Sequence, residues 1–148
     1  PQLLSAIYRS LSLDEDDLAA DIADGFLLSV DAAHALHPNY PDKSDPTNRP
    51  RLGSGLVIKQ AAGQSYVGDA TATAIIKGLC EANDIPYQTF ANRSSIPGGS
   101  TLGAIASANL GMRGQDVGVP LLAMHSARET MAAADQEALT RLLRAFFS

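Results

Sequence analysis

The stretch from Asp31 to His37 carries residue types suited to metal or acid–base chemistry. Asp31 follows a short apolar run, and His34 and His37 come three and six residues later. A carboxylate at the carboxyl end of a buried strand lies where α/β sheets usually place ligands, and it could bind a metal or act as a base. If the next residues turned helical, His34 would share a face with Asp31. Local spacing does not decide between this and a second interpretation, in which Asp31 caps a helix and both histidines are ordinary surface residues.

Three further positions could contribute to a site. His125 follows an apolar run, and neutral imidazole is a common zinc ligand, although a structural histidine bonded to a backbone carbonyl fits as well. Lys59 ends a short apolar run, where it is either solvated or aimed into a pocket that attracts a carboxylate. The segment Gly98–Thr101 lets the backbone approach a ligand and opens a predicted helix, whose free N–H groups favour anions. It also fits a tight turn in which Ser100 or Thr101 caps the helix.

Hydrophobic periodicity predicts the elements that would hold these residues. Helical spacing predicts helices over about 2–11, 15–23, 70–82 and 98–109. Ser12 or Asp14 could cap the second of these, and Asp135 is expected to cap a last helix that runs to about 147. Short apolar runs predict strands over about 26–30, 56–59, 87–91 and 116–119. Residues 34–51 and 120–126 are expected to be loops. Strands alternate with helices, which predicts the α/β class with a mixed, largely parallel sheet in a single unit.

Composition argues against several classes of function. The net charge is −5 and the pI is about 5.0, which argues against a nucleic-acid-binding surface. No apolar run approaches the roughly 20 residues that a membrane helix needs, and no secretory pattern opens the sequence. Cys80 is the only cysteine, so there is no intrachain disulfide and no CxxC metal site. We therefore expect a cytoplasmic globular protein with neither nucleic-acid nor membrane partners.

Several motifs in one order resemble the aspartyl aminopeptidase (M18) family of metallopeptidases. Residues 29–40 read SVDAAHALHPNY and are similar to that family's S-x-D-x-A-H-A-x-H-P-N-Y signature. The other matching blocks are Asn48-Arg49-Pro50, Val57-Ile58-Lys59, Asn92-Arg93-Ser94, Gly98-Gly99-Ser100-Thr101-Leu102-Gly103, and Ala123-Met124-His125-Ser126 with Arg128-Glu129. The similarity runs from about Leu3 to Phe147. Six blocks in one order are far more specific than any single block.

The resemblance implies a three-layer α/β zinc-peptidase fold, of which residues 1–148 would form the C-terminal part of the catalytic domain. It implies an exopeptidase that releases N-terminal residues, often Asp or Glu, from peptides. Two zinc ions would hold the attacking water and polarise the scissile carbonyl, and a glutamate would act as the general base. The implied partners are the peptide substrate and further copies of the full-length chain in a homo-oligomer.

The same resemblance assigns roles to five residues. Asp31 is implied as a ligand of one zinc and His125 as a ligand of the other. His34, Lys59 and Tyr66 match positions that contact substrate. No catalytic residue is expected within this chain, because the family's first zinc histidine, its bridging aspartate and its Glu-Glu pair all precede the matching region.

Two departures from the family pattern bear on specificity. Ser95 stands where the family usually has an aspartate, and Gly98 replaces a cysteine found in many relatives. Two alternatives also stay open at this point. One is a truncated or degenerate relative that acts in binding or assembly without catalysis. The other is a serine hydrolase that uses Ser100 and His125, although the Gly-Gly-Ser-Thr setting differs from the G-x-S-x-G nucleophile elbow.

Overall fold

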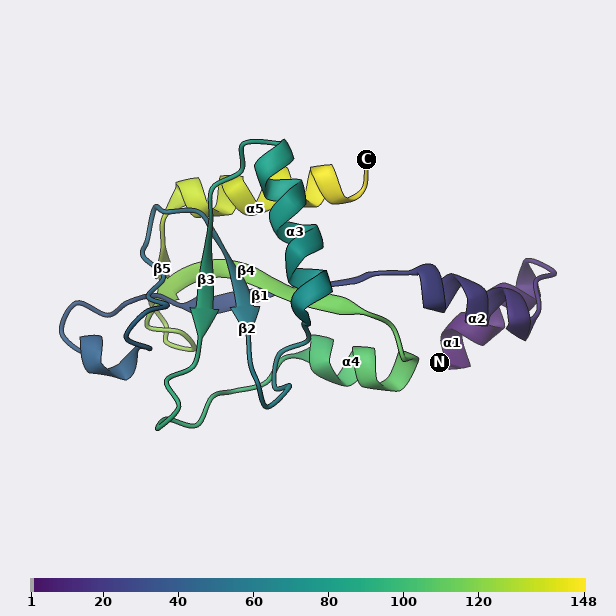
Figure 1. Ribbon diagram of the computed structural model, residues 1–148, viewed down its shortest axis with the longest axis horizontal. Helices are drawn as coiled ribbons and strands as arrows, with labels where there is room; N and C mark the ends of the chain where they lie inside the picture. The colour runs from purple at the N-terminus through teal and green to yellow at the C-terminus, as the bar shows by residue number, and fades with distance from the viewer. Residues whose placement is uncertain (1) are drawn as a thin grey trace.

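The computed structural model describes residues 2–148, which form a mixed sheet with helices on both faces (Figure 1). The helices are α1 (Gln2–Ser10), α2 (Glu15–Asp24), α3 (Ala70–Ala82), α4 (Leu102–Leu110) and α5 (Ala133–Phe146), with a short 3-10 helix, η1, over Pro41–Lys43. The strands are β1 (Leu27–His34), β2 (Leu56–Gln60), β3 (Tyr87–Ala91), β4 (Gly114–Leu122) and β5 (Thr130–Met131).

The sheet has the order β1-β4-β2-β3, and β5 pairs with the end of β4. β1 runs parallel to β4, and β2 runs parallel to β3, whereas β2 and β4 are antiparallel. Every residue of β4 except the last is buried, as expected for a strand that is covered on both faces. The predicted α/β class with a mixed, largely parallel sheet is therefore confirmed.

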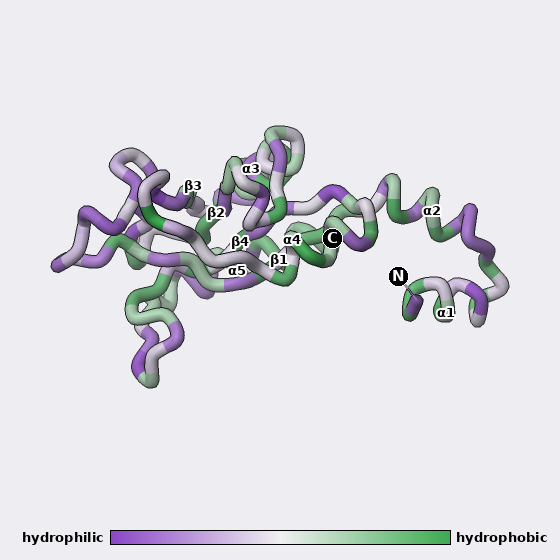
Figure 2. Tube along the Cα trace, turned by 90° about the horizontal axis from the view of Figure 1, so that it is seen from below, coloured by the Kyte–Doolittle hydropathy of each residue, from purple (hydrophilic) through white to green (hydrophobic). Residues whose placement is uncertain are grey.

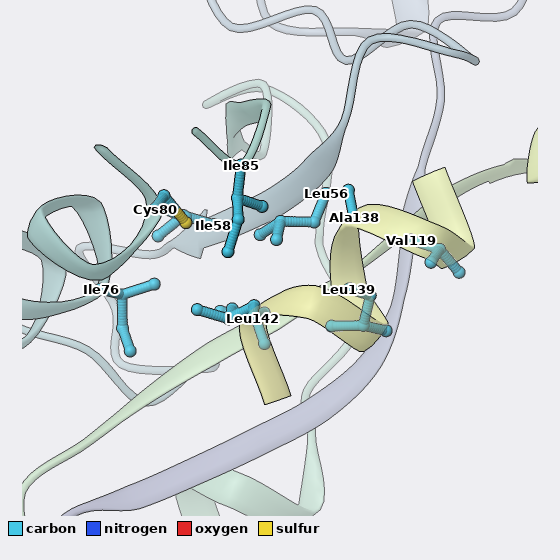
Figure 3. Close-up of a cluster of buried hydrophobic side chains, with 10 residues drawn as sticks. Leu56, Ile58, Ile76, Cys80, Ile85, Val119, Ala138, Leu139 and Leu142 are labelled. Atoms are coloured by element: carbon cyan, nitrogen blue, oxygen red, sulfur yellow. The ribbon is translucent and has the colours of Figure 1, made fainter. Parts of the chain in front are cut away.

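Most of the hydrophobic core lies between the sheet and the helices α3 and α5 (Figure 3). Leu56 and Ile58 of β2 pack there against Ile76 of α3 and Leu142 of α5, and all four are fully buried. Burial of each such side chain contributes about 1.5–3 kcal/mol. The shorter α4 contacts β1 and β4 on the other face (Figure 1). Helices thus cover both faces of the sheet, which gives the three predicted layers.

Strand β1 is longer than predicted, and this changes the setting of Asp31. The strand continues to His34 instead of ending at Val30, so Asp31 neither caps nor opens a helix. Residues three apart in a strand point to opposite faces, so the helical juxtaposition of Asp31 with His34 is wrong. Pairing with β4 extends the strand, with Asp31 beside Gly118 and His34 beside Leu121. This pairing is a tertiary contact that local sequence does not encode.

Strand β4 is also longer than predicted, because residues 120–122 belong to it and not to a loop. A proline is tolerated here because of its position in the pairing pattern. β2 pairs with β4 only at Val117 and Gly118, and β5 pairs only at Leu121 and Leu122. Pro120 therefore lies in the gap between the two partners, where a missing N–H costs least.

The helix starts follow the predicted capping residues only in part. Asp14 caps α2 with a full capping box, in which it accepts hydrogen bonds from the backbone of Asp16 and Asp17. Asp135, in contrast, does not cap α5, because that helix already begins at Ala133. The buried Asp135 carboxylate accepts hydrogen bonds from the N–H groups of Gly53 and Gly55, at 2.7 and 2.8 Å. It therefore fixes the loop that leads into β2.

Helices α1 and α2 form a hairpin that projects from the rest of the molecule in both views (Figures 1 and 2). The two helices contact each other, and the Tyr8 hydroxyl donates to Asp21 at 2.5 Å. Leu3, Ile7 and Leu11 of the α1 segment stay exposed. The hairpin therefore presents an apolar stripe to its surroundings. None of the described helices is long and apolar enough to cross a membrane.

Gly118 fixes the close approach of β4 to the Asp31 segment of β1, which leads to a first prediction. A Cβ atom at Gly118 would lie 2.0 Å from the carbonyl oxygen of Asp31, so a side chain would force the strands apart. We expect Gly118→Ala to destabilise the fold by about 1–3 kcal/mol, as overpacking does. Gly78→Ala on α3 is the control, since its Cβ meets no atom within 4 Å. Thermal unfolding should show a lower Tm for Gly118→Ala alone, and equal Tm values would contradict the prediction.

Candidate functional site

An ion pair between Lys59 and Asp31 forms the centre of the candidate site. The Lys59 Nζ lies 3.1 Å from Asp31 Oδ2, and it lies 4.8 Å from the centre of the Tyr66 ring. The Lys59 side chain is only 3% exposed, whereas that of Asp31 is 51% exposed. β1 and β2 position the charged pair, and the segment after β2 supplies Tyr66. The structure thus brings together three of the five residues that the sequence singles out.

The surroundings of the ion pair lower the pKa values of two groups, Asp31 and His34. Partial burial of the Asp31 carboxyl opposes ionisation. This effect of burial is outweighed by the hydrogen bond from the Ala32 N–H and by the positive charges of Lys59 and His125. The pKa of Asp31 therefore lies below its ordinary value. Burial, with the positive charges of Lys59 and His125, also lowers the pKa of His34. At neutral pH the site therefore offers a carboxylate together with a neutral imidazole.

His125 lies in a turn after β4 whose backbone is unusual. Ala123 and His125 both have left-handed backbone conformations, with φ of 57° and 67°. Such conformations cost free energy and persist only where surrounding contacts hold them, as at many functional sites. The Glu129 carboxylate accepts a hydrogen bond from the His125 N–H, and Ser126 N–H donates to the Ala123 carbonyl. The turn leaves the His125 side chain exposed and near enough to affect the pKa of Asp31.

A pocket of about 400 Å³ opens beside these residues. His34 and His37 line it together with residues from the loops around 40–44 and 92–99 and from the end of β4. Neither Lys59 nor Tyr66 lines it, but Asn92 connects it to them by donating to the Tyr66 hydroxyl at 3.4 Å. Among residues 2–148, the lining includes the cations Lys43 and Arg93 and no carboxylate.

The glycine segment before α4 forms part of the pocket wall. A Cβ at Gly98 would lie 2.0 Å from the side-chain nitrogen of Asn92, so a larger residue here would require the Asn92 side chain to move. Thr101 precedes α4 but makes no capping hydrogen bond, because its hydroxyl donates to Asp116 instead. Among the described residues, Ser100 makes no hydrogen bond with His125. The structure therefore gives no support to a serine hydrolase.

The described residues do not by themselves fit a zinc ion. No three His, Cys, Asp or Glu side chains of residues 2–148 are grouped so that they could hold a metal. A catalytic zinc normally has three protein ligands. Asp31 is an accessible, ionised carboxylate and His125 is an exposed imidazole, so each has the chemistry of a single ligand. A complete metal site would need further donors.

Two carboxylates with structural roles were not recognised from the sequence. The sequence pattern predicts only that Asp116 begins a strand and that Asp135 caps a helix, yet both are fully buried and bind backbone N–H groups. Asn92 belongs to a matching family block but has no predicted role, although it lines the pocket and donates to Tyr66. A polar residue inside an apolar pattern was the available signal for Asp116.

Comparisons with known proteins find both sequence relatives and similar solved structures. The chain is 44% identical over 146 residues to "Probable M18 family aminopeptidase 2" of Clostridium novyi (strain NT), covering 99% of this chain and 34% of that protein. Its structure is similar to a chain in a cryo-EM structure of the Ape4 and Nbr1 complex, with a TM-score of 0.92, 36% identity, and coverage of 98% of this chain and 28% of that chain. It also resembles the mApe1 dodecamer of S. cerevisiae, with a TM-score of 0.81, 25% identity, and coverage of 98% and 32%. The chain thus spans about a third of the length of the curated relatives that it matches.

The α/β layers and these structural neighbours place the molecule in the class of metallopeptidase folds. A family model described as "Aminopeptidase I zinc metalloprotease (M18)" matches residues 1–147. The chain therefore belongs to the M18 aminopeptidase family, as the six sequence blocks indicate.

Proposed function

We propose that this chain is part of a zinc aminopeptidase that removes N-terminal residues, preferentially Asp or Glu, from peptides. The observation that carries the proposal is the family match over residues 1–147, together with the Asp31–Lys59–Tyr66 cluster beside the pocket. We further propose that the 148 residues belong to a longer polypeptide, which we call the full-length protein. The coverage of only 34% of a curated relative supports this, as does the lack of a three-donor group among residues 2–148.

In the full-length protein, this chain would form the C-terminal part of the catalytic domain. Asp31 would be a ligand of one zinc ion, and His125 would be a ligand of a second zinc ion. The lowered pKa of Asp31 keeps its carboxylate ionised and available as a ligand. The remaining ligands and the general base would come from residues outside this sequence. The dodecameric yeast neighbour supports a homo-oligomer, and a sequence with a single cysteine agrees with a reducing, cytoplasmic environment.

His34, Lys59 and Tyr66 would contact the substrate. His34 lines the pocket, and Lys59 places a positive charge next to it, buried and paired with only one carboxylate. A second carboxylate, from an acidic substrate side chain, would gain from that charge and from the cations Lys43 and Arg93 in the pocket wall. The absence of any carboxylate from the lining favours an acidic side chain over a basic one.

Replacing Lys59 tests this assignment. In the full-length protein, Lys59→Met should lower the ratio of kcat/KM for Asp-anilide to that for Leu-anilide by about 10- to 100-fold, because a charged hydrogen bond contributes about 1.5–3 kcal/mol. The ratio separates the loss of specificity from any general effect of leaving Asp31 unpaired. Lys77→Met is a matched control, since Lys77 also lies over a tyrosine ring, that of Tyr87. An unchanged preference in Lys59→Met would show that Lys59 does not select the acidic side chain.

A further inference from the structure

Asp116 is the most completely enclosed carboxyl group near the candidate site. It lies on β4, its side chain is fully buried, and its Oδ2 accepts two short hydrogen bonds. One comes from the backbone N–H of Val67 at 2.7 Å and the other from the Thr101 hydroxyl at 2.6 Å. The backbone N–H of Asp116 also donates to the Val67 carbonyl at 2.8 Å. Asp116 thus binds two segments, at Val67 and at Thr101, that are separated in the sequence by α3 and β3.

The two segments held by Asp116 both carry residues of the site or its pocket. Val67 directly follows Tyr66, whose ring lies against Lys59. Thr101 directly follows the glycine segment, in which Gly98 and Gly99 line the pocket. The two segments also meet directly, because Thr101 N–H donates to the Ser65 carbonyl at 3.2 Å. The Asp116 carboxyl group and the Thr101–Ser65 hydrogen bond therefore fix the position of one segment relative to the other.

A continuous series of contacts leads from Asp116 to the ion pair. Asp116 holds Val67, the adjacent Tyr66 ring lies 4.8 Å from Lys59 Nζ, and Lys59 binds Asp31 at 3.1 Å. On the other side, the Tyr66 hydroxyl accepts from Asn92, against which Gly98 packs. All of these groups are buried or half-buried except Asp31 and Gly98, so a shift of the Val67 segment is transmitted to its neighbours.

We propose that Asp116 is a positioning residue for the aminopeptidase reaction. Its two accepted hydrogen bonds fix the Tyr66 segment relative to the glycine segment, and through Tyr66 and Lys59 they fix the orientation of Asp31. This inference rests on the proposed function for its catalytic consequence, whereas the positioning itself can be measured without any turnover.

The hydrogen-bond pattern of Asp116 allows a discriminating substitution. Oδ2 accepts both hydrogen bonds, whereas Oδ1 is buried and has no hydrogen-bond partner among the described residues. Asn has the same shape, and its one oxygen can accept both hydrogen bonds while its NH₂ group takes the place of Oδ1. Asp116→Asn thus keeps the proposed positioning contacts, and Asp116→Ala removes them. Thr101→Val removes only the hydroxyl contact.

Asp135 offers a matched control. It is another fully buried aspartate that accepts two backbone hydrogen bonds, from Gly53 and Gly55, but it holds the loop at the start of β2, away from the pocket. Asp135→Ala should lower Tm about as much as Asp116→Ala. Because it lies apart from the site, kcat/KM should stay within about threefold of wild type at a temperature where both variants are folded.

The kinetic experiment uses the zinc-loaded, full-length protein with Asp-anilide. Asp116→Ala should lose about 100-fold in kcat/KM, with a higher KM as well as a lower kcat, because small displacements of positioned groups are costly. Thr101→Val should lose about tenfold, in line with the loss of one hydrogen bond. Asp116→Asn should stay within about threefold of wild type, because the accepted hydrogen bonds persist. At saturating zinc, the amount of bound zinc should be unchanged in all three variants, because none removes a metal ligand.

Amide hydrogen exchange provides the second measurement and needs no activity. The amides of Val67 and Thr101 should exchange faster in Asp116→Ala than in Asp116→Asn, while those of the β2 core strand stay protected in both. Equal losses of activity in the Asn and Ala variants would overturn the proposal, as would an equal loss in Asp135→Ala. If wild type has no aminopeptidase activity, the proposed function fails, and the exchange pattern alone then supports or overturns the positioning role.

Discussion

In the full-length protein, Asp31→Ala is expected to reduce kcat by at least about 1,000-fold, because a catalytic metal contributes several kcal/mol to transition-state stabilisation. The same substitution should lower the amount of bound zinc. Asp31 is half-exposed and ionised, and the N–H of Ala32 and the ammonium of Lys59 fix its orientation. His125→Ala should have an equally large effect, because it would remove a ligand from the other ion.

The control for Asp31→Ala must remove a similar carboxylate at a different place. Asp69 is suitable, because it is 53% exposed and pairs with Arg113 at 3.3 Å, much as Asp31 pairs with Lys59. Asp69→Ala should leave the zinc content and kcat nearly unchanged, with a modest loss of stability because Asp69 also caps α3. Metal analysis that finds two full equivalents of zinc in both Asp31→Ala and His125→Ala would contradict the assignment of these residues as ligands.

Residues 1–148 alone are expected to show no peptidase activity and no tight zinc binding, which is the largest effect that we predict. Asp31 and His125 would give each ion only one ligand from this chain, whereas a catalytic zinc normally has three. Residues 2–148 hold no group of three donors that could compensate. The general base would also be missing. Zinc titration by calorimetry and an Asp-anilide assay test both parts of this prediction.

The isolated chain should also be poorly soluble. Leu3, Leu102 and Phe147 are between 74% and 82% exposed, and β1 pairs on one side only within the described sheet. Exposed apolar side chains and an open strand edge favour association with another chain. Mixing the isolated chain with the remaining part of the full-length protein should then restore solubility together with activity. Metal-dependent turnover by residues 1–148 alone would refute the prediction, and activity that appears only on mixing would support it.

Much of the architecture could be predicted from local sequence. The apolar spacing of residues 70–82 and the Asp14 capping box specify α3 and α2 because helical hydrogen bonds and caps form between near neighbours in the chain. The alternation of strands and helices specifies the α/β class. The ordered motifs around Asp31, Lys59 and His125 identified the family, and the matches to known proteins confirm it.

The tertiary structure decided the features that depend on distant partners. Pairing with β4 carries β1 through Asp31 to His34, and local spacing contains no information about that partner. Asp135 is indistinguishable in sequence from an ordinary capping residue, and Asp116 is marked only by its position at the start of an apolar run. They are buried because the N–H groups that they bind come from segments 49 and 80 or more residues away. The sequence alone therefore determined which residues could do chemistry, while long-range pairing and burial determined how Asp31, Lys59 and Tyr66 are held together.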